Sequence, residues 1–260
     1  MVQGRAQAGR RRAPVWDLGC WLSLSAILLT ACASRADVRK ADAHYKMGYS
    51  YLIDQQVQQA YVEFQKAVEI NPKDRDAHYA LGHVYFLKGS FNEAEREFRR
   101  VIKLKSDDAA AWNYLGKVSE EQGKNDAALE YYDRALSFPQ YPTPDLVHYN
   151  KGKVYLKRAQ PEAALREFTA ALRVNPTHVL AAFEAGRIYE DLSAVPQATA
   201  AYEIAVKQAP NFAEAYYRLA KVYSRAGKTD QARDAYRKVV ELAPGSQWAE
   251  DANAQIARPQ

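Results

Sequence analysis

Histidine is the residue type here best suited to chemistry, because its imidazole titrates near neutral pH and binds metal ions. Three of the five histidines, His44, His78 and His148, recur at one place in a repeated pattern described below. Equivalent places in successive helical repeats lie roughly 10 Å or more apart, whereas a metal ion needs all its ligands at about 2 Å. We therefore interpret the three as packing residues of a helix. His83 and His178 have no evident partner in the sequence.

No other pattern typical of catalysis is present. The sequence has no glycine-rich phosphate loop, and none of its serines lies in a strand–turn–helix frame that could present a nucleophile. We expect a protein that is not an enzyme and that uses no cofactor, no metal and no small-molecule substrate.

Six alanines, 34 to 36 residues apart, define a repeat that must position any functional side chain: Ala60, Ala94, Ala128, Ala164, Ala198 and Ala232. Twelve residues before each alanine stands a glycine or an alanine, and four residues after it stands an aromatic. Small residues let two helices approach closely where they cross, and the aromatic lies on the apolar stripe of the second helix. A period near 34 residues with this pattern is typical of stacked helix pairs.

These positions resemble the tetratricopeptide repeat, whose tryptophan, leucine and glycine appear as Trp112, Leu115 and Gly116. The resemblance implies an all-α fold, a right-handed superhelical solenoid of six helix pairs closed by a capping helix. The six units, called repeats 1 to 6 below, are residues 41–74, 75–108, 109–142, 145–178, 179–212 and 213–246, and residues 247–260 form the capping helix and tail. In four units a proline at position 32 is expected to end the second helix: Pro72, Pro176, Pro210 and Pro244.

Helix boundaries can be predicted from polar residues and prolines near the turns. Asn92, Asp126 and Asp230 lie where a second helix should begin, and we expect them to be N-caps. Pro161 and Pro196 lie at the equivalent place, where the first helical turn tolerates proline. Ser246 is expected to be the N-cap of the final helix. That helix would cover the exposed face of the last repeat.

The first 31 residues read as a signal peptide, with a basic start and then an apolar run from Cys20 to Leu29 that is short for a transmembrane helix. The segment ends in Leu29-Thr30-Ala31-Cys32, which resembles the lipobox of bacterial lipoproteins. The resemblance implies lipidation of Cys32, with residues 32–40 as a lipidated N-terminus and short tether. A secretory signal cleaved nearby, or an uncleaved anchor, is the alternative.

Sorting and charge bear on where the protein would work. Ala33 follows the cysteine, and the lack of aspartate there resembles lipoproteins sent to the outer membrane. We therefore expect a lipid anchor in that membrane, facing the periplasm. The chain carries a formal net charge of +5, of which the leader's four arginines and one aspartate supply three charges. The remaining excess is too small to indicate nucleic-acid binding.

The concave face of such a solenoid usually binds proteins. In tetratricopeptide repeats, positions 5 and 9 of each unit line the groove on this concave face. The two positions are neighbours on one helix face. Repeats 4 to 6 place an aromatic and then a base there, an aromatic–basic ladder that would suit an acidic extended peptide. Repeats 1 and 2 are more apolar and could form a second contact surface. The candidate residues are Tyr149, Lys153, Phe183, Arg187, Tyr217 and Lys221 in the ladder, and Tyr45, Tyr49, Leu52 and Phe86 in the apolar surface. A solvated basic face balanced by acids such as Glu190 and Asp191 is the alternative to the ladder.

A connector with three prolines, residues 138–144, separates repeats 3 and 4. With the lipobox and the repeats, it resembles the outer-membrane pilotins of type IV pilus biogenesis. That resemblance implies a non-enzymatic scaffold that binds a secretin subunit and promotes secretin assembly. An adaptor for cell-wall enzymes, for outer-membrane protein assembly or for exopolysaccharide export is the alternative.

Overall fold

The computed structural model describes the backbone of residues 19–257 and the side chains of residues 35–257. Over this part the chain is helical, with no strand. It divides into two units that are described separately, Met1–Ala77 and His78–Gln260. The helices are α1 (Gly19–Ile53), α2 (Val57–Ile70), α3 (Arg75–Leu87), α4 (Phe91–Leu104), α5 (Ala109–Glu121), α6 (Asn125–Leu136), α7 (Pro144–Lys157), α8 (Pro161–Val174), α9 (Val179–Asp191), α10 (Val195–Gln208), α11 (Ala213–Arg225), α12 (Thr229–Leu242) and α13 (Gln247–Ile256).

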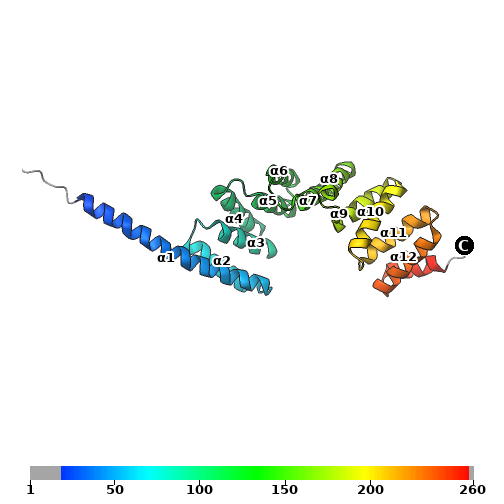
Figure 1. Cartoon of the computed structure of the whole chain (residues 1–260), viewed down its shortest axis with the longest axis horizontal. Coiled ribbons are helices and arrows are strands. Elements are labelled where there is room, and N and C mark those ends of the chain that lie inside the picture. The colour runs from blue at the N-terminus through cyan, green and yellow to red at the C-terminus, as the bar shows by residue number, and fades with distance from the viewer. Residues whose placement is uncertain (1–18, 258–260) are drawn as a thin grey trace, which may run out of the picture. The chain divides into compact units, whose positions relative to one another are not determined.

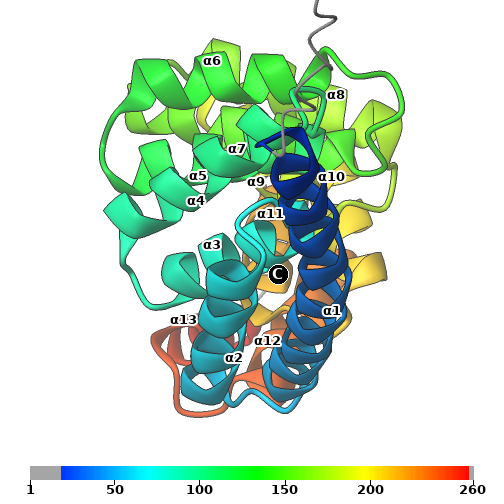
Figure 2. The same ribbon diagram turned by 90° about the vertical axis from the view of Figure 1, so that its left-hand side faces the viewer.

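In the first unit, α1 and α2 pack side by side, as Figure 2 shows. Helix α1 runs through Cys32 and Lys40 without a break, so the backbone of residues 32–40 is helical. The reason is compositional, since this stretch contains neither glycine nor proline and is rich in residues that tolerate a helix. Part of the expected signal peptide, residues 1–18, lies outside the described residues. Among the described helices, none combines the length and apolar character needed to cross a membrane.

In the second unit, each helix pair packs on the next from α4 to α13 (Figure 1). Buried alanines and aromatics of neighbouring repeats form a chain of core clusters along it. The expected all-α tetratricopeptide fold is confirmed, and the final helix α13 packs on α12 and buries Ala252. The Ser246 cap is also confirmed, because its hydroxyl accepts from the Ala249 N–H at 3.2 Å.

The glycine before each helix crossing is fitted to one aromatic ring. A Cβ added to Gly116 would lie 2.4 Å from the Tyr132 ring, and a Cβ added to Gly152 would lie 2.4 Å from the Phe168 ring. Such distances are far inside van der Waals contact. The glycine is therefore required because the ring of the second helix occupies the space where a side chain would stand.

The N-cap predictions for Asn92, Asp126 and Asp230 are wrong. Helices α4, α6 and α12 begin one residue earlier than each of them, and none has a side-chain cap. Each of these helices follows a turn with a glycine in the left-handed conformation, such as Gly123 with φ of 73°, which lets the chain change direction there. Asp126 and Asp230 lie instead in the first turn, where their carboxylates interact favourably with the positive end of the helix dipole.

The prolines behave as expected. Pro161 and Pro196 lie in the first turn of α8 and α10. Pro144, the last residue of the proline-containing connector, begins α7. Side-chain caps are found instead on first helices of the repeats, where Asp108 and His178 accept hydrogen bonds from backbone N–H groups of α5 and α9.

Candidate protein-interaction surface

A buried glutamate joins repeat 3 to repeat 4. Glu120, in the last turn of α5, has a side chain only 2% exposed, and its carboxylate accepts from the Tyr132 hydroxyl at 3.1 Å. Lys157 Nζ lies 2.8 Å and Lys153 Nζ 3.1 Å from the same carboxylate. Burial would raise the pKa of Glu120, but the hydrogen bonds and charges of Lys157 and Lys153 outweigh it and hold that pKa below its usual value.

The same arrangement recurs two repeats later. Glu190 in α9 accepts from the Tyr202 hydroxyl at 3.0 Å. Arg218 and Arg225 of α11 each lie 3.4 Å from its carboxylate, and Lys221 lies 4.0 Å away. Each acid stands at position 12 of its repeat, and the bases stand at positions 9 and 13 of the following repeat, with Arg218 at position 6 in addition. The interface between repeats 3 and 4 and that between repeats 5 and 6 are therefore ionic as well as apolar.

In repeats 1 to 5, the aromatic at position 24 matches the residue at position 12 within its own repeat. Repeats 3 and 5 have tyrosine at position 24, and this tyrosine donates to the glutamate at position 12. Repeats 1, 2 and 4 have phenylalanine at position 24 and an apolar residue at position 12, namely Leu52, Phe86 and Leu156. In these five repeats the buried hydroxyl is therefore present where a glutamate partner for it exists.

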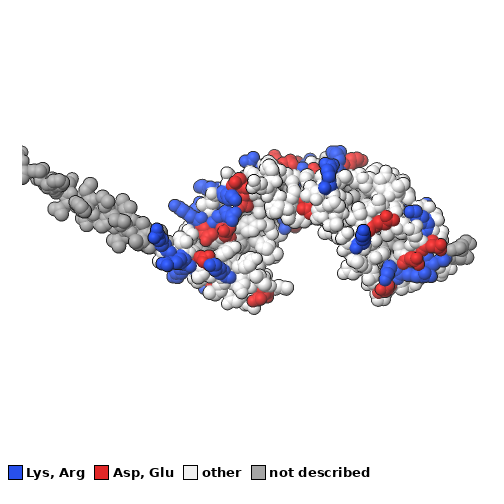
Figure 3. Space-filling view, viewed as in Figure 1, with Lys and Arg blue, Asp and Glu red and all other residues white. Residues whose placement is uncertain are grey.

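The bases of the expected aromatic–basic ladder are already paired within the chain. Lys153 contacts Glu120, Lys221 lies at the limit of ion-pair distance from Glu190, and Arg187 Nη1 lies 3.0 Å from Glu184. These three side chains remain 38–45% exposed. On the face shown in Figure 3, basic and acidic side chains of the second unit are interspersed and form no continuous basic field.

The aromatic half of the ladder is less exposed than its basic half. Phe183 is only 5% exposed and belongs to the core around Tyr202. Tyr149 and Tyr217 are half-buried, and the Tyr217 hydroxyl donates to Asp251 of the capping helix at 3.1 Å. Of the three rings, only Tyr149 and Tyr217 are therefore accessible to a ligand.

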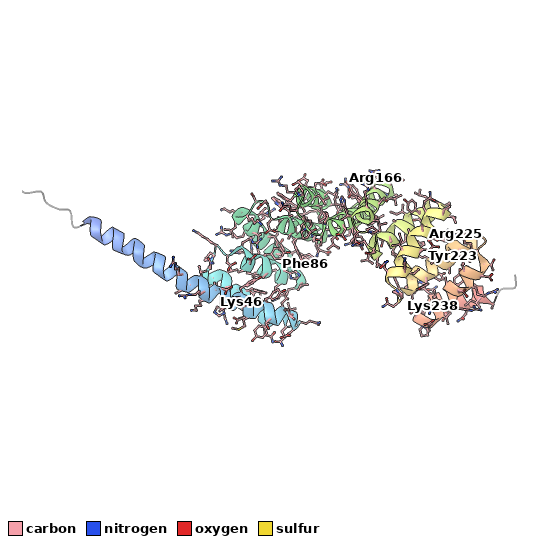
Figure 4. The ribbon with its side chains drawn as sticks, viewed as in Figure 1. Lys46, Phe86, Arg166, Tyr223, Arg225 and Lys238 are labelled. Carbon is pink, nitrogen blue, oxygen red and sulfur yellow. The ribbon has the colours of Figure 1, made fainter. Side chains whose placement is uncertain are left out.

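The apolar candidates of repeat 1 lie on α1. Tyr45 packs between Tyr49 and Phe64, with ring centroids 6.4 and 5.8 Å away. Tyr49 is 53% exposed and Leu52 is half-buried. Phe86 belongs to the second unit, on α3 (Figure 4), where it packs against Tyr114 with ring centroids 5.9 Å apart. Cys32 lies outside the described side chains.

The interpretation of three histidines as packing residues is incomplete, because each contacts a glutamate of the second helix of its repeat. His44 Nδ1 lies 2.6 Å from Glu63, and the pairs His78–Glu97 and His148–Glu167 are equivalent, at 2.6 and 2.7 Å. The glutamate stands nineteen positions after the histidine in every case, a spacing that could have been noticed in the sequence. No cluster of potential metal ligands occurs in the described residues.

The remaining two histidines do have partners. His178 caps α9, its Nδ1 accepting from the Ala181 N–H at 3.2 Å, and its ring lies 5.1 Å from that of Tyr149. His83 lies edge-on to Tyr114, with ring centroids 5.3 Å apart.

Solved structures resemble the chain over most of its length. It is 25% identical to PilF of Pseudomonas aeruginosa, with a TM-score of 0.74 over 85% of this chain and 99% of that one. PilW, described as a widely conserved type IV pilus biogenesis factor, is 20% identical, with a TM-score of 0.69 over 82% of this chain and 98% of that one. YrrB, a TPR protein with an unusual peptide-binding site, is 21% identical, with a TM-score of 0.57 over 74% of this chain and 97% of that one.

Family models match the repeats directly. Models described as tetratricopeptide repeat match residues 79–143, 149–198 and 213–246, and one described as TPR repeat matches residues 50–89. No curated protein matches the chain in sequence. Like other members, it is built as a scaffold for protein interaction, and the chain belongs to the tetratricopeptide repeat family.

Proposed function

We propose that this protein is a non-enzymatic pilotin, a lipid-anchored scaffold of the outer membrane that binds secretin subunits and promotes their assembly during type IV pilus biogenesis. The observation that carries the proposal is the match to PilF, which extends over 99% of that chain at a TM-score of 0.74. PilW supports it, since its description names type IV pilus biogenesis.

The lipid anchor is the second part of the proposal. Leu29-Thr30-Ala31-Cys32 follows a basic start and an apolar run, which is the order found in lipoprotein signals. Acyl chains on Cys32 would hold the repeats at the membrane surface. Within the described residues, the helix that continues from position 32 into repeat 1 would start the solenoid directly from the anchor.

The test uses the two cysteines of the chain. Cys32→Ala is expected to leave the protein unprocessed or soluble and to lower the amount of heat-resistant secretin multimer in membranes. Cys20→Ala, a change in the leader outside the lipobox, is the matched control and is expected to have no effect. Membrane fractionation and immunoblotting of the multimer measure both outcomes.

Two results would overturn the proposal in different ways. A wild-type level of secretin multimer in cells that lack the protein would rule out the pilotin role. Processing of Cys32→Ala to the mature size, with the product still in the outer membrane, would remove the anchor.

A further inference from the structure

A hollow of about 410 Å³ lies between repeats 5 and 6, lined by side chains of α10, α11 and α12. Two of its lining residues, Tyr223 and Lys238, are labelled in Figure 4. Clefts that bind small molecules have volumes of roughly 300–1,000 Å³, so this one has room for a long side chain. Its residues from α11 stand at positions 4, 7 and 11 of repeat 6. The hollow therefore does not include positions 5 and 9, which line the groove.

A short side chain at position 23 of repeat 6 leaves room for the hollow. Repeats 1, 2 and 4 have a glutamate at position 23 that contacts the histidine at position 4. Repeat 3 has Tyr131 at position 23, packed against Trp112 at position 4. Repeat 6 has Tyr216 at position 4 but only Ala235 at position 23, and both line the hollow. The half-buried Tyr216 ring is therefore left facing this space.

One carboxylate of the hollow has a charge that no base of the described chain balances. Glu203 Oε1 accepts from the Tyr223 hydroxyl at 2.7 Å, and no described lysine or arginine lies within ion-pair distance of Glu203. The two other charged residues of the hollow are balanced on their own helix. Asp234 lies 3.0 Å from the arginine three residues later, and Lys238 lies 2.7 Å from the glutamate three residues later. The remaining charge is the single negative charge of Glu203.

The two tyrosine rings of the hollow differ in how far they are available to a ligand. Tyr223 is only 8% exposed, and Lys228 Nζ lies 5.4 Å from its ring centroid. Lys228 belongs to the turn before α12 and is not among the lining residues. Within the described part of the chain, no cation lies over the Tyr216 ring in the same way. Tyr216 is therefore the ring that can receive a cation from outside the chain.

We propose that the hollow binds an arginine side chain of a partner protein. The guanidinium would stack on the Tyr216 ring and donate to the oxygen of Glu203 that Tyr223 does not occupy, because a planar guanidinium suits both kinds of contact. The apolar stem of the arginine would lie against Val206 and Leu219, which also line the hollow. One positive charge matches the one unbalanced negative charge. The proposal rests on the proposed function only in assuming a protein partner.

The experiment measures which central residue of a short peptide is retained by the immobilised full chain in detergent. Four synthetic libraries have blocked ends and random sequences except at the centre, which is arginine, lysine, citrulline or glutamate. Citrulline has nearly the shape of arginine without its charge. Lysine would satisfy Glu203, but its compact, strongly hydrated ammonium does not stack on a ring as guanidinium does. Enriched peptides are then synthesised for calorimetry.

Three variants connect retention to the hollow. Ala235→Tyr fills the space with the side chain that repeat 3 has at the same position, and it adds no charge. Glu203→Gln removes the charge and keeps an oxygen that can accept from the Tyr223 hydroxyl. Glu130→Gln, at an exposed glutamate of α6 outside the hollow, is the control for loss of one acid. Circular dichroism checks the fold of each variant, and Glu203→Gln alone decides if Ala235→Tyr does not fold.

The expected result is retention of arginine peptides above lysine peptides, with citrulline and glutamate peptides lost. Binding of the selected peptides should be lost in Ala235→Tyr, about threefold weaker in Glu203→Gln and unchanged in Glu130→Gln. Equal retention of arginine and citrulline, or binding that neither hollow variant changes, would overturn the site. Equal retention of arginine and lysine would overturn the stacking on Tyr216. Secretin multimers are scored separately in cells, so that failure of this site and failure of the pilotin role can be distinguished.

Discussion

Tyr202 donates its hydroxyl hydrogen to Glu190 over 3.0 Å, from the second helix of repeat 5 back to the first. Both residues are buried, and burial together with the Glu190 charge raises the pKa of Tyr202. The bond is thus a neutral phenol held against a carboxylate, a charge-assisted contact in a low dielectric. Repeat 4 fills the same two positions with Leu156 and Phe168, which gives an apolar version for comparison.

Tyr202→Phe is expected to lower the free energy of unfolding by about 1–3 kcal/mol, because a buried carboxylate loses a donor. Glu190→Leu should be costly for the converse reason, since it leaves the hydroxyl without an acceptor. The double variant recreates the apolar pair of repeat 4, so its cost should be smaller than the sum of the two single costs. Urea denaturation of the four proteins measures this coupling, and strict additivity would contradict it.

Alanine at the helix-crossing glycines should be destabilising in proportion to the space that the ring leaves. Gly152→Ala is expected to cost about 1–3 kcal/mol, because its Cβ would lie 2.4 Å from the Phe168 ring. Gly82→Ala is the milder comparison, since its Cβ would lie 3.1 Å from Phe98. Thermal unfolding by circular dichroism should rank wild type first, Gly82→Ala second and Gly152→Ala last. The reverse order of the two variants would mean that the ring is not what excludes the side chain.

Acidification should weaken repeat 4 through Glu167. Burial would raise the pKa of this carboxyl, but hydrogen bonds from His148 and Lys151 prevail and lower it. A carboxyl whose pKa is lowered on folding stabilises the protein fully above its unfolded pKa, and this stability is lost as pH falls through the folded pKa. The stability gap between wild type and Glu167→Gln should therefore shrink below about pH 4.5. Exposed Glu130→Gln is the control, expected to show no such change.

Three turns carry a side chain where the others carry glycine. Gln55, Ala159 and Ser193 have φ of 59°, 53° and 55°, the left-handed region that Gly123 occupies at the equivalent place in repeat 3. Ala159→Gly is expected to raise the free energy of unfolding by about 1 kcal/mol, because it relieves the left-handed conformation. Gly123→Ala is its mirror test: nothing lies near the added Cβ, so its loss of stability should come from φ alone. Equal stability of both variants and wild type would refute the strain.

The periodicity of the sequence was sufficient to predict the fold because each repeated position has a single role in packing. The alanines such as Ala164 and the rings such as Phe168 are fully buried, as their spacing predicts. The N-cap predictions for the second helices were wrong because a residue in the left-handed conformation, not a polar side chain, sets where those helices begin. An aspartate near a turn does not reveal which residue of that turn takes the left-handed conformation.

The surface was harder to predict for a different reason. The ladder was inferred from neighbours on one helix, Lys153 after Tyr149 and Lys221 after Tyr217, whereas their ion-pair partners lie on the preceding repeat. On a single helix, Glu190 has the pattern of a surface acid that balances a basic face, and Glu120 has no pattern that points to the bases. Reading positions 9, 12 and 13 across consecutive repeats would have found both glutamates. Charge pairing in a solenoid is a property of interfaces, so single-helix patterns miss it.

The ionic interfaces between repeats 3 and 4 and between repeats 5 and 6 make a pair of repeats the interchangeable module of this region. Deleting repeat 4 alone would set Glu120 against Arg187 and Asp191, one base and one acid. Deleting repeats 4 and 5 together would set it against Lys221 and Arg225, again two bases. The variant that lacks both repeats is therefore expected to have a higher melting temperature than the variant that lacks repeat 4 alone. Loss of core contacts alone would give the opposite order. Growth of such a chain by duplication would be tolerated in steps of two repeats.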